Sequence, residues 1–171
     1  MFGCSDGSKC LVALQSHNKR FVSAEENGKA NANSEKYQNS EVFEVTFHGP
    51  NKVNLKGYHK KYLYSKSDGT VNADGTNTNY IGYYWTVEYK GKDGFAFKSY
   101  LGKYLVAETN GVLNANGNNA GLWESFKVIK VKGRPNKIKL LMDLIFGCIF
   151  KAIKIKVQAV LCLLFFEIVE K

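Results

Sequence analysis

Three segments of the chain, beginning at Val12, Val53 and Phe95, alternate apolar and polar residues in the same way. They read VALQSHNKRFVSAEENGKANAN, VNLKGYHKKYLYSKSDGTVNAD and FAFKSYLGKYLVAETNGVLNAN. The first apolar pair of each, such as Val12 and Leu14, has the two-residue period of a half-buried β-strand. Because the segments start 41 and 42 residues apart, the pattern predicts three copies of one supersecondary unit.

Each unit is predicted to contain four strands. A basic turn follows the first strand, and a second apolar stretch, around Phe21, Tyr62 or Tyr104, then ends at a turn dipeptide. The dipeptides Asn27-Gly28, Asp68-Gly69 and Asn110-Gly111 predict tight hairpins with type I′ turns. The last strand ends in an aromatic residue, any residue and Val, and we expect these aromatic residues in the core: Phe43, Trp85 and Phe126.

The repeat predicts an all-β fold. One four-stranded unit has an apolar face with nothing to cover it, so it must pack against its copies. Three units of about forty residues favour a β-trefoil with pseudo-threefold symmetry, because a propeller of four-stranded blades needs four or more. A propeller remains the alternative, since its blades have a similar length. We expect a lead over 1–10 and a trefoil over 11–131, with repeats 11–50, 51–91 and 92–131.

A different kind of sequence follows the last repeat. Residues 132–136 contain Gly and Pro and are predicted to be a linker. Residues 137–171 are rich in Ile, Leu, Phe and Val and are predicted to form a helical tail. A membrane span from Leu144 to Phe166 would place three Lys near its middle, each costing about 2.5–3.5 kcal/mol. The open alternatives are a helix at an anionic membrane surface, a helix docked on the trefoil or a partner, and misassigned coding sequence.

The charge and the cysteines restrict the partners and the compartment. The net charge is +9, with sixteen Lys/Arg and twelve Asp/Glu in residues 1–131 and eight and three in 132–171. The trefoil is too balanced for nucleic-acid binding, which needs a strongly basic face. No cysteine lies between 11 and 131, so no disulfide framework is expected there. With no apolar secretory signal at the start, we expect a cytosolic protein.

The repeat also carries a family resemblance. Val53-Asn54-Leu55-Lys56, Lys61-Tyr62-Leu63, Val71-Asn72-Ala73 and Trp123-Glu124-Ser125-Phe126 resemble the fascin-like β-trefoil domains of actin-crosslinking proteins, and also hisactophilin. The resemblance covers residues 11–131 and implies a cytoskeletal, actin-binding role. Fascin has four such trefoils, so a single one would need dimerisation or a second surface to crosslink filaments. Hisactophilin has many more histidines than the three here, so no strong pH switch is expected.

The first turn of each unit is the candidate partner-binding site. Pseudo-threefold symmetry would bring these turns to one end of the trefoil, where their charges would attract an acidic partner such as an actin filament or anionic lipid. Solvation alone would also explain lysines in turns. The predicted residues are His17, Lys19, Arg20, Lys56, His59, Lys60, Lys61, Lys98 and Lys103.

Carbohydrate binding is the alternative function. Loops rich in Asn follow the third strands, and exposed tyrosines beside them would stack on a sugar ring. The candidate residues are Asn33, Asp74 and Asn116, with Tyr58, Tyr80, Tyr83, Tyr89 and Tyr100 as stacking candidates. The Gln-x-Trp motif of ricin-type lectins is absent. Because the chain also lacks catalytic motifs and metal-site spacing, we expect neither an enzyme nor a cofactor or metal.

Overall fold

The computed structural model describes residues 10–76 and 79–132, which lie in the first of two units of the chain, residues 1–132. Twelve strands and two short 3-10 helices form in this described part, and the all-β prediction is confirmed. In chain order they are β1 (Cys10–Gln15), β2 (Phe21–Ala24), β3 (Ala30–Ser34), β4 (Val42–Phe47), β5 (Lys52–Lys56), β6 (Tyr62–Ser65), β7 (Val71–Gly75), η1 (Ile81–Tyr83), β8 (Trp85–Tyr89), η2 (Gly91–Asp93), β9 (Phe95–Lys98), β10 (Tyr104–Ala107), β11 (Leu113–Gly117) and β12 (Ser125–Lys130).

Six of these strands close into a barrel. The first and last strands of the three repeats pair antiparallel around a ring in the order β1, β4, β5, β8, β9, β12 and back to β1. Equivalent residues make equivalent pairs, as where Val45 faces Leu55 and Val87 faces Phe97. A closed ring has no exposed strand edge, so it removes the liability of unpaired backbone groups.

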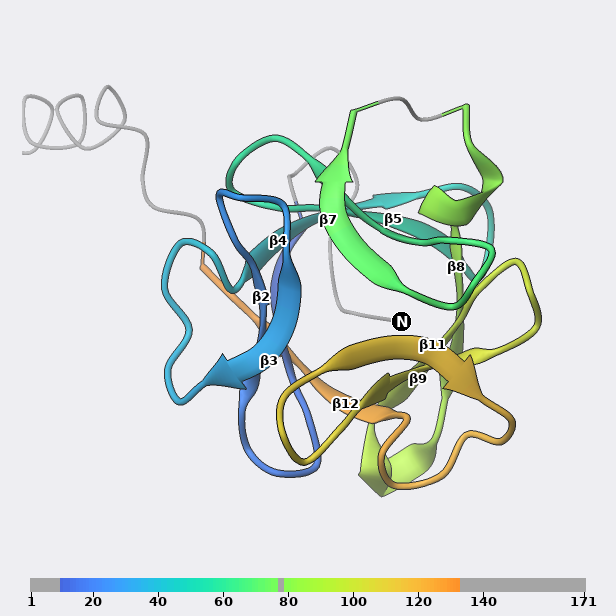
Figure 1. Cartoon of the computed structure of the whole chain (residues 1–171). Coiled ribbons are helices and arrows are strands. Elements are labelled where there is room, and N and C mark those ends of the chain that lie inside the picture. The colour runs from blue at the N-terminus through green and yellow to red at the C-terminus, as the bar shows by residue number, and fades with distance from the viewer. Residues whose placement is uncertain (1–9, 77–78, 133–171) are drawn as a thin grey trace, which may run out of the picture. The chain divides into compact units, whose positions relative to one another are not determined.

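The remaining strands form three hairpins, β2–β3, β6–β7 and β10–β11, one from each repeat. In Figure 1 the strands β3, β7 and β11 lie around a common centre. Three backbone hydrogen bonds join the hairpins in a cycle: Ala32 N–H donates to Gly111 O (2.7 Å), Ala73 N–H to Gly28 O (2.8 Å) and Ala115 N–H to Gly69 O (2.7 Å). Each hairpin therefore donates to one neighbour and accepts from the other.

The core is built from the same positions of each repeat. The predicted core aromatics Phe43, Trp85 and Phe126 are fully buried, and Trp85 Nε1–H donates to Leu63 O at 3.1 Å. Apolar residues of the barrel and of the hairpins join one cluster, which explains why the three units need one another. In the second strands, Phe21 and Tyr104 are also buried, while Tyr62 is half-buried.

The hairpin turns form where predicted, but their predicted type is wrong. Type I′ needs positive φ at two residues, whereas only the glycine is left-handed here, with φ of 84–85° at Gly28, Gly69 and Gly111. The residue before each glycine instead uses its side-chain oxygen to accept the N–H two residues on, as Asn27 Oδ1 does from Lys29 (3.0 Å). Asp68 and Asn110 make the same bond, at 2.9 and 3.0 Å. These Asx bonds favour an ordinary negative φ in the side chains that make them.

Several sequence predictions fall outside the described residues. Residues 1–9 of the predicted lead over 1–10, the linker beyond Lys132 and the tail over 137–171 lie there, so those predictions and the boundaries between the predicted parts stay predictions. Cys10, at the start of β1, is disulfide-bonded. It is the one cysteine of the described sequence, so these strands are not cross-linked to one another. Within residues 10–76 and 79–132, no helix is long and apolar enough to cross a membrane.

The cycle of hairpins predicts an unequal cost for two glycine substitutions. A methyl group at Gly28 would lie 2.5 Å from Asp74 Cβ of the next hairpin, whereas one at Gly102 would meet nothing within 4 Å. Both glycines have a left-handed φ, of 85° and 73°. Gly102→Ala should therefore cost about 1 kcal/mol of unfolding free energy from the backbone alone, and Gly28→Ala about 1–3 kcal/mol more from overpacking. Urea unfolding measures both, and equal losses would show that the hairpins are not packed as described.

Candidate functional site

The three basic turns that connect the barrel to the hairpins share one backbone structure. They span Ser16–Arg20, Gly57–Lys61 and Ser99–Lys103. In each, the N–H of the first residue donates to the carbonyl of the fifth at 2.8 Å, and the N–H of the fourth donates back to the carbonyl of the first at 3.0–3.1 Å. The same bonds in all three turns give three equivalent places for side chains.

The fourth residue of each turn is left-handed. Its φ is 67° at Lys19, 66° at Lys60 and 73° at Gly102. This conformation costs an L-residue roughly 1–2 kcal/mol, and glycine adopts it freely. Two turns thus have an exposed lysine at this position, whereas the third has glycine, which suits a left-handed backbone. The left-handed φ therefore disfavours lysine at both positions and does not explain its presence.

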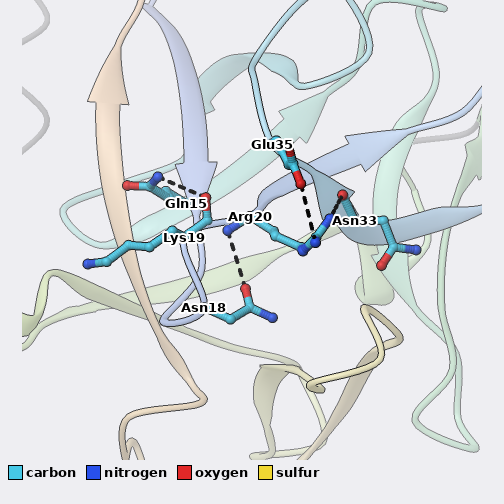
Figure 2. A network of polar contacts seen from close by, with 6 residues as sticks. All are labelled: Gln15, Asn18, Lys19, Arg20, Asn33 and Glu35. Carbon is cyan, nitrogen blue, oxygen red and sulfur yellow. Dashed lines mark hydrogen bonds and ion pairs between the residues drawn. The ribbon is translucent and has the colours of Figure 1, made fainter.

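Arg20 is engaged within its own repeat. Its Nη1 donates to Asn33 O at 2.6 Å, and its Nη2 lies 3.5 Å from Glu35 Oε1. Figure 2 shows the Lys19 side chain pointing away from this network, while Gln15 Nε2 donates to the Lys19 carbonyl at 3.0 Å. Of these two neighbouring cations, Lys19 is therefore the one available to a partner.

Other predicted cations are held against neighbours. Lys56 Nζ lies 5.2 Å from the ring centre of Tyr62, and Lys98 Nζ lies 5.0 Å from that of Tyr104, so both make cation–π contacts with the strand opposite. Lys103 Nζ donates to Asn118 Oδ1 of the following loop. His59 and Lys61 are half-exposed on the second turn. Among the predicted lysines, these contacts distinguish Lys19 and Lys60 as the two most open.

Topology brings the three turns to the same end of the barrel. Strands β1, β5 and β9 run parallel to one another, since each is antiparallel to the strand between them, and the turns follow their carboxyl ends. In Figure 1 the turns lie at separate points around the rim. Ring contacts for the first and third turns, and a shared cavity for the second, place each one beside the last loop of the preceding repeat.

At two of these three junctions an aromatic ring of the loop covers the second residue of the turn. The Trp123 ring stacks on His17, with centres 5.6 Å apart and an angle of 8° between planes. His17 Nδ1 is buried there without a hydrogen-bond partner among the described residues. The Tyr80 ring packs edge-on against Tyr100 at 5.9 Å, and their hydroxyls lie 3.0 Å apart.

The third junction is hollow. Beside Tyr58, the residue equivalent to His17 and Tyr100, lies a cavity of about 480 Å³. It is lined by residues of two repeats: Ser34, Gln38, Asn39, Ser40, Glu41, Tyr58 and His59. Tyr58 is 54% exposed, and its ring contacts His59 of the same turn at 5.3 Å. Tyr58 is one of the five tyrosines that the sequence suggests for stacking on a sugar, and the adjoining cavity distinguishes it from the other four.

The residues predicted to bind sugar are spread over the three hairpins. Asn33, Asp74 and Asn116 are all exposed, and each lies beside the turn glycine of a different neighbouring hairpin: Gly111, Gly28 and Gly69. None of the three lines the cavity beside Tyr58. Their equivalent contacts give them a packing role at the joints between hairpins, and the cavity uses other residues of the first loop.

The tyrosines of the second repeat form a cluster that sequence reasoning did not foresee. Tyr64 packs on Tyr83 at 5.0 Å and on Tyr80 at 6.1 Å. Burial, followed by the neighbouring Asp74 carboxylate, raises the pKa of Tyr64 to about 12. The hydrogen bond with Tyr100, followed by burial, raises the pKa of Tyr80 to about 12. Of the predicted stacking residues, Tyr80 and Tyr100 therefore hold the second loop on the third turn, and Tyr83 packs within the second repeat.

Within 10–76 and 79–132 there is no group of three or more His, Cys, Asp or Glu side chains that could hold a metal ion. The described residues do present open cations at one end of the barrel and a cavity lined by amide, hydroxyl and carboxylate groups beside an exposed aromatic ring.

A comparison with family models matches residues 17–128 to the fascin domain. This match spans all three repeats, from the first basic turn into the last barrel strand. A comparison with curated proteins found no match.

The left-handed lysines predict an unusual stabilisation. Lys60→Gly should raise the unfolding free energy by about 0.5–1 kcal/mol, because relief of the left-handed backbone outweighs the added freedom of the unfolded chain. Lys61→Gly, in the same turn but without a positive φ, should lower it by roughly 0.4–1 kcal/mol. Urea unfolding of both variants checks the opposite signs, and a loss of stability in Lys60→Gly would contradict the strain.

The tyrosine cluster predicts a loss of stability in alkali. Because the folded state raises the pKa of Tyr64 from 10.0 to about 12, the unfolded chain loses this proton first as the pH rises. The stabilisation is thus complete below about pH 10 and declines as the pH rises to about 12. Tyr64→Phe should make the urea midpoint less dependent on pH in this window. Tyr89→Phe, a substitution at a ring that is 71% exposed, is the control, and identical profiles for wild type and Tyr64→Phe would refute the assignment.

Proposed function

This chain belongs to the fascin domain family, and from that premise we propose that it is a binding module for actin filaments that acts through the basic end of its barrel. The family is one of non-enzymatic binding domains. We infer that the closed barrel and its three hairpins are a β-trefoil, which the threefold repetition of strand pairs and of hairpin contacts supports. Fold alone does not specify a partner, so the proposal depends on the surface.

The observation that carries the proposal is the pair of lysines at left-handed positions. Lys19 and Lys60 are exposed, occupy equivalent places, and point from turns at the same end of the barrel. Glycine would suit the backbone better at both places, as Gly102 does in the third turn. The left-handed backbone is strained at both lysines, yet their exposed side chains do not pack in the core. This favours a role for the side chains themselves, in this case attraction of an acidic surface.

The remaining predicted residues support this end in a different way. Arg20 is tied to Glu35, and Lys56 and Lys98 lie over aromatic rings, so these cations are positioned rather than free. They add to the positive field around the turns without needing to touch a filament. Their contribution would be to the rate of association and its dependence on salt.

Crosslinking needs more than one site. A single trefoil with one basic end joins two filaments only by self-association or through a second surface, and residues 137–171 are the part of the sequence that could supply either. We place the protein with the cytoskeleton in the cytoplasm. The basic, apolar tail would add contact with an anionic membrane surface.

Co-sedimentation of the full chain with actin filaments at low ionic strength tests the proposal. Charge reversal of both turn lysines, Lys19→Glu with Lys60→Glu, should weaken filament affinity at least about thirtyfold, because each reversal removes a surface attraction of roughly 1 kcal/mol and adds a repulsion. Lys92→Glu is the matched control, since Lys92 lies in η2 between β8 and β9, at the opposite end of the barrel.

The wild type should also release filaments as salt is added. Pelleting that is indifferent to the double reversal, or reduced equally by Lys92→Glu, would overturn this site. Absence of pelleting for the wild-type chain at low salt would overturn actin binding itself.

A further inference from the structure

The three junctions between repeats are built alike, yet only one of the three described junctions has its turn ring uncovered. At each, the second residue of a basic turn faces the loop between the third and fourth strands of the preceding repeat. His17 meets Trp123, and Tyr100 meets Tyr80. The fold therefore provides a place for a flat ring beside each turn, and the chain itself fills two of them.

At the remaining junction the loop has no aromatic residue at the positions that cover the turn in the other two repeats. Counted back from the barrel aromatic, Ser40 stands where Trp123 stands in the third repeat, and Gln38 stands where Tyr80 stands in the second. The aromatic residue of this loop, Tyr37, packs edge-on against Phe21 of its own repeat at 5.3 Å. Tyr58 is left 54% exposed beside the cavity of about 480 Å³.

The groups around the cavity are hydrogen-bonding groups of mixed kind. Gln38 and Asn39 contribute amides, Ser34 and Ser40 hydroxyls, and Glu41 a carboxylate. Glu41 is 7% exposed and held in place: its Oε1 accepts from Ser23 Oγ at 2.6 Å, and its Oε2 accepts from Gln38 N at 2.7 Å. A fixed carboxylate oxygen still has lone pairs for a further donor, so it can accept from a ligand hydroxyl.

We propose that this cavity is a binding site for a neutral saccharide, whose ring stacks on Tyr58 while its hydroxyls bond to Gln38, Asn39 and Glu41. A pyranose has one apolar face and a rim of hydroxyl groups that both donate and accept, which matches a bare tyrosine ring beside amides and a carboxylate. The volume lies within the range of small-molecule sites. The buried Glu41 carboxylate disfavours an anionic ligand.

This site adjoins the filament-binding surface proposed above, since Tyr58 and Lys60 belong to the same turn, but the two use different side chains. It uses Tyr58 and the loop of residues 34–41, whereas the filament surface uses Lys19 and Lys60. It also differs from the alternative of Asn33, Asp74 and Asn116, which lie at the joints between hairpins. A saccharide would thus occupy the one of the three described junctions where no aromatic ring of the loop covers the turn.

Binding of the full chain to an array of neutral mono- and disaccharides tests the proposal, followed by titration of the best sugar with the free protein. Tyr58→Ala should weaken the affinity about tenfold, the size of one lost aromatic contact, while Tyr58→Phe should retain most of it because the stacking face remains. Gln38→Ala should weaken it several-fold. Tyr89→Ala, at an exposed ring that does not line this cavity, is the matched control and should bind as the wild type does.

Each variant is first compared with the wild type by thermal unfolding, so that a loss of binding is not mistaken for a loss of fold. Adenosine serves as a second ligand, because a nucleoside also presents a flat ring. No binding anywhere on the array, sugar binding that survives Tyr58→Ala, or a preference for adenosine over every sugar would overturn the proposal. Filament binding of Tyr58→Ala should be unchanged, so this site and the filament surface can fail independently.

Discussion

Three hydrogen bonds between the hairpins are the constraint on which the rest of the molecule depends. Ala32, Ala73 and Ala115 are buried, and each donates its N–H to the turn glycine of another repeat. A buried N–H left without a partner costs about 1–3 kcal/mol, so the removal of any repeat would leave both a donor and an acceptor unpaired in the others. The apolar cluster under the hairpins imposes the same condition, because no single unit covers its own face.

Much of this architecture was predictable from the spacing of residues. The offsets of 41 and 42 residues gave the units, and the aromatic residues Phe43, Trp85 and Phe126 were correctly expected in the core. The type of the hairpin turns was not predicted correctly, because Asn27 and Asp68 use their side chains to accept backbone N–H groups and keep a negative φ. A dipeptide pattern alone does not distinguish that bond from a left-handed backbone.

The candidate site was less predictable, since it depends on contacts between repeats. Sequence reasoning grouped Arg20, Lys56 and Lys98 with Lys19, but the structure pairs Arg20 with Glu35 and lays the two lysines over aromatic rings. The cavity beside Tyr58 arises because Gln38 and Ser40 stand where other repeats have an aromatic residue. An alignment of the three loops signals that difference, but only the structure shows that the loop of one repeat faces the turn of the next.

A repeated scaffold thus explains where binding surfaces arise in this protein. The barrel and the cycle of hairpins are the symmetric parts, and they hold the three units together. Function is expected where the repeats differ: at the left-handed lysines that the third repeat replaces with Gly102, and at the junction that no ring of the chain covers. Amide hydrogen exchange of Ala32, Ala73 and Ala115 in the full chain tests the central claim most directly. If the cycle holds the units together, these three amides should exchange at similar rates and only through global unfolding. One of them exchanging far faster than the others, through an opening of its own hairpin, would contradict it.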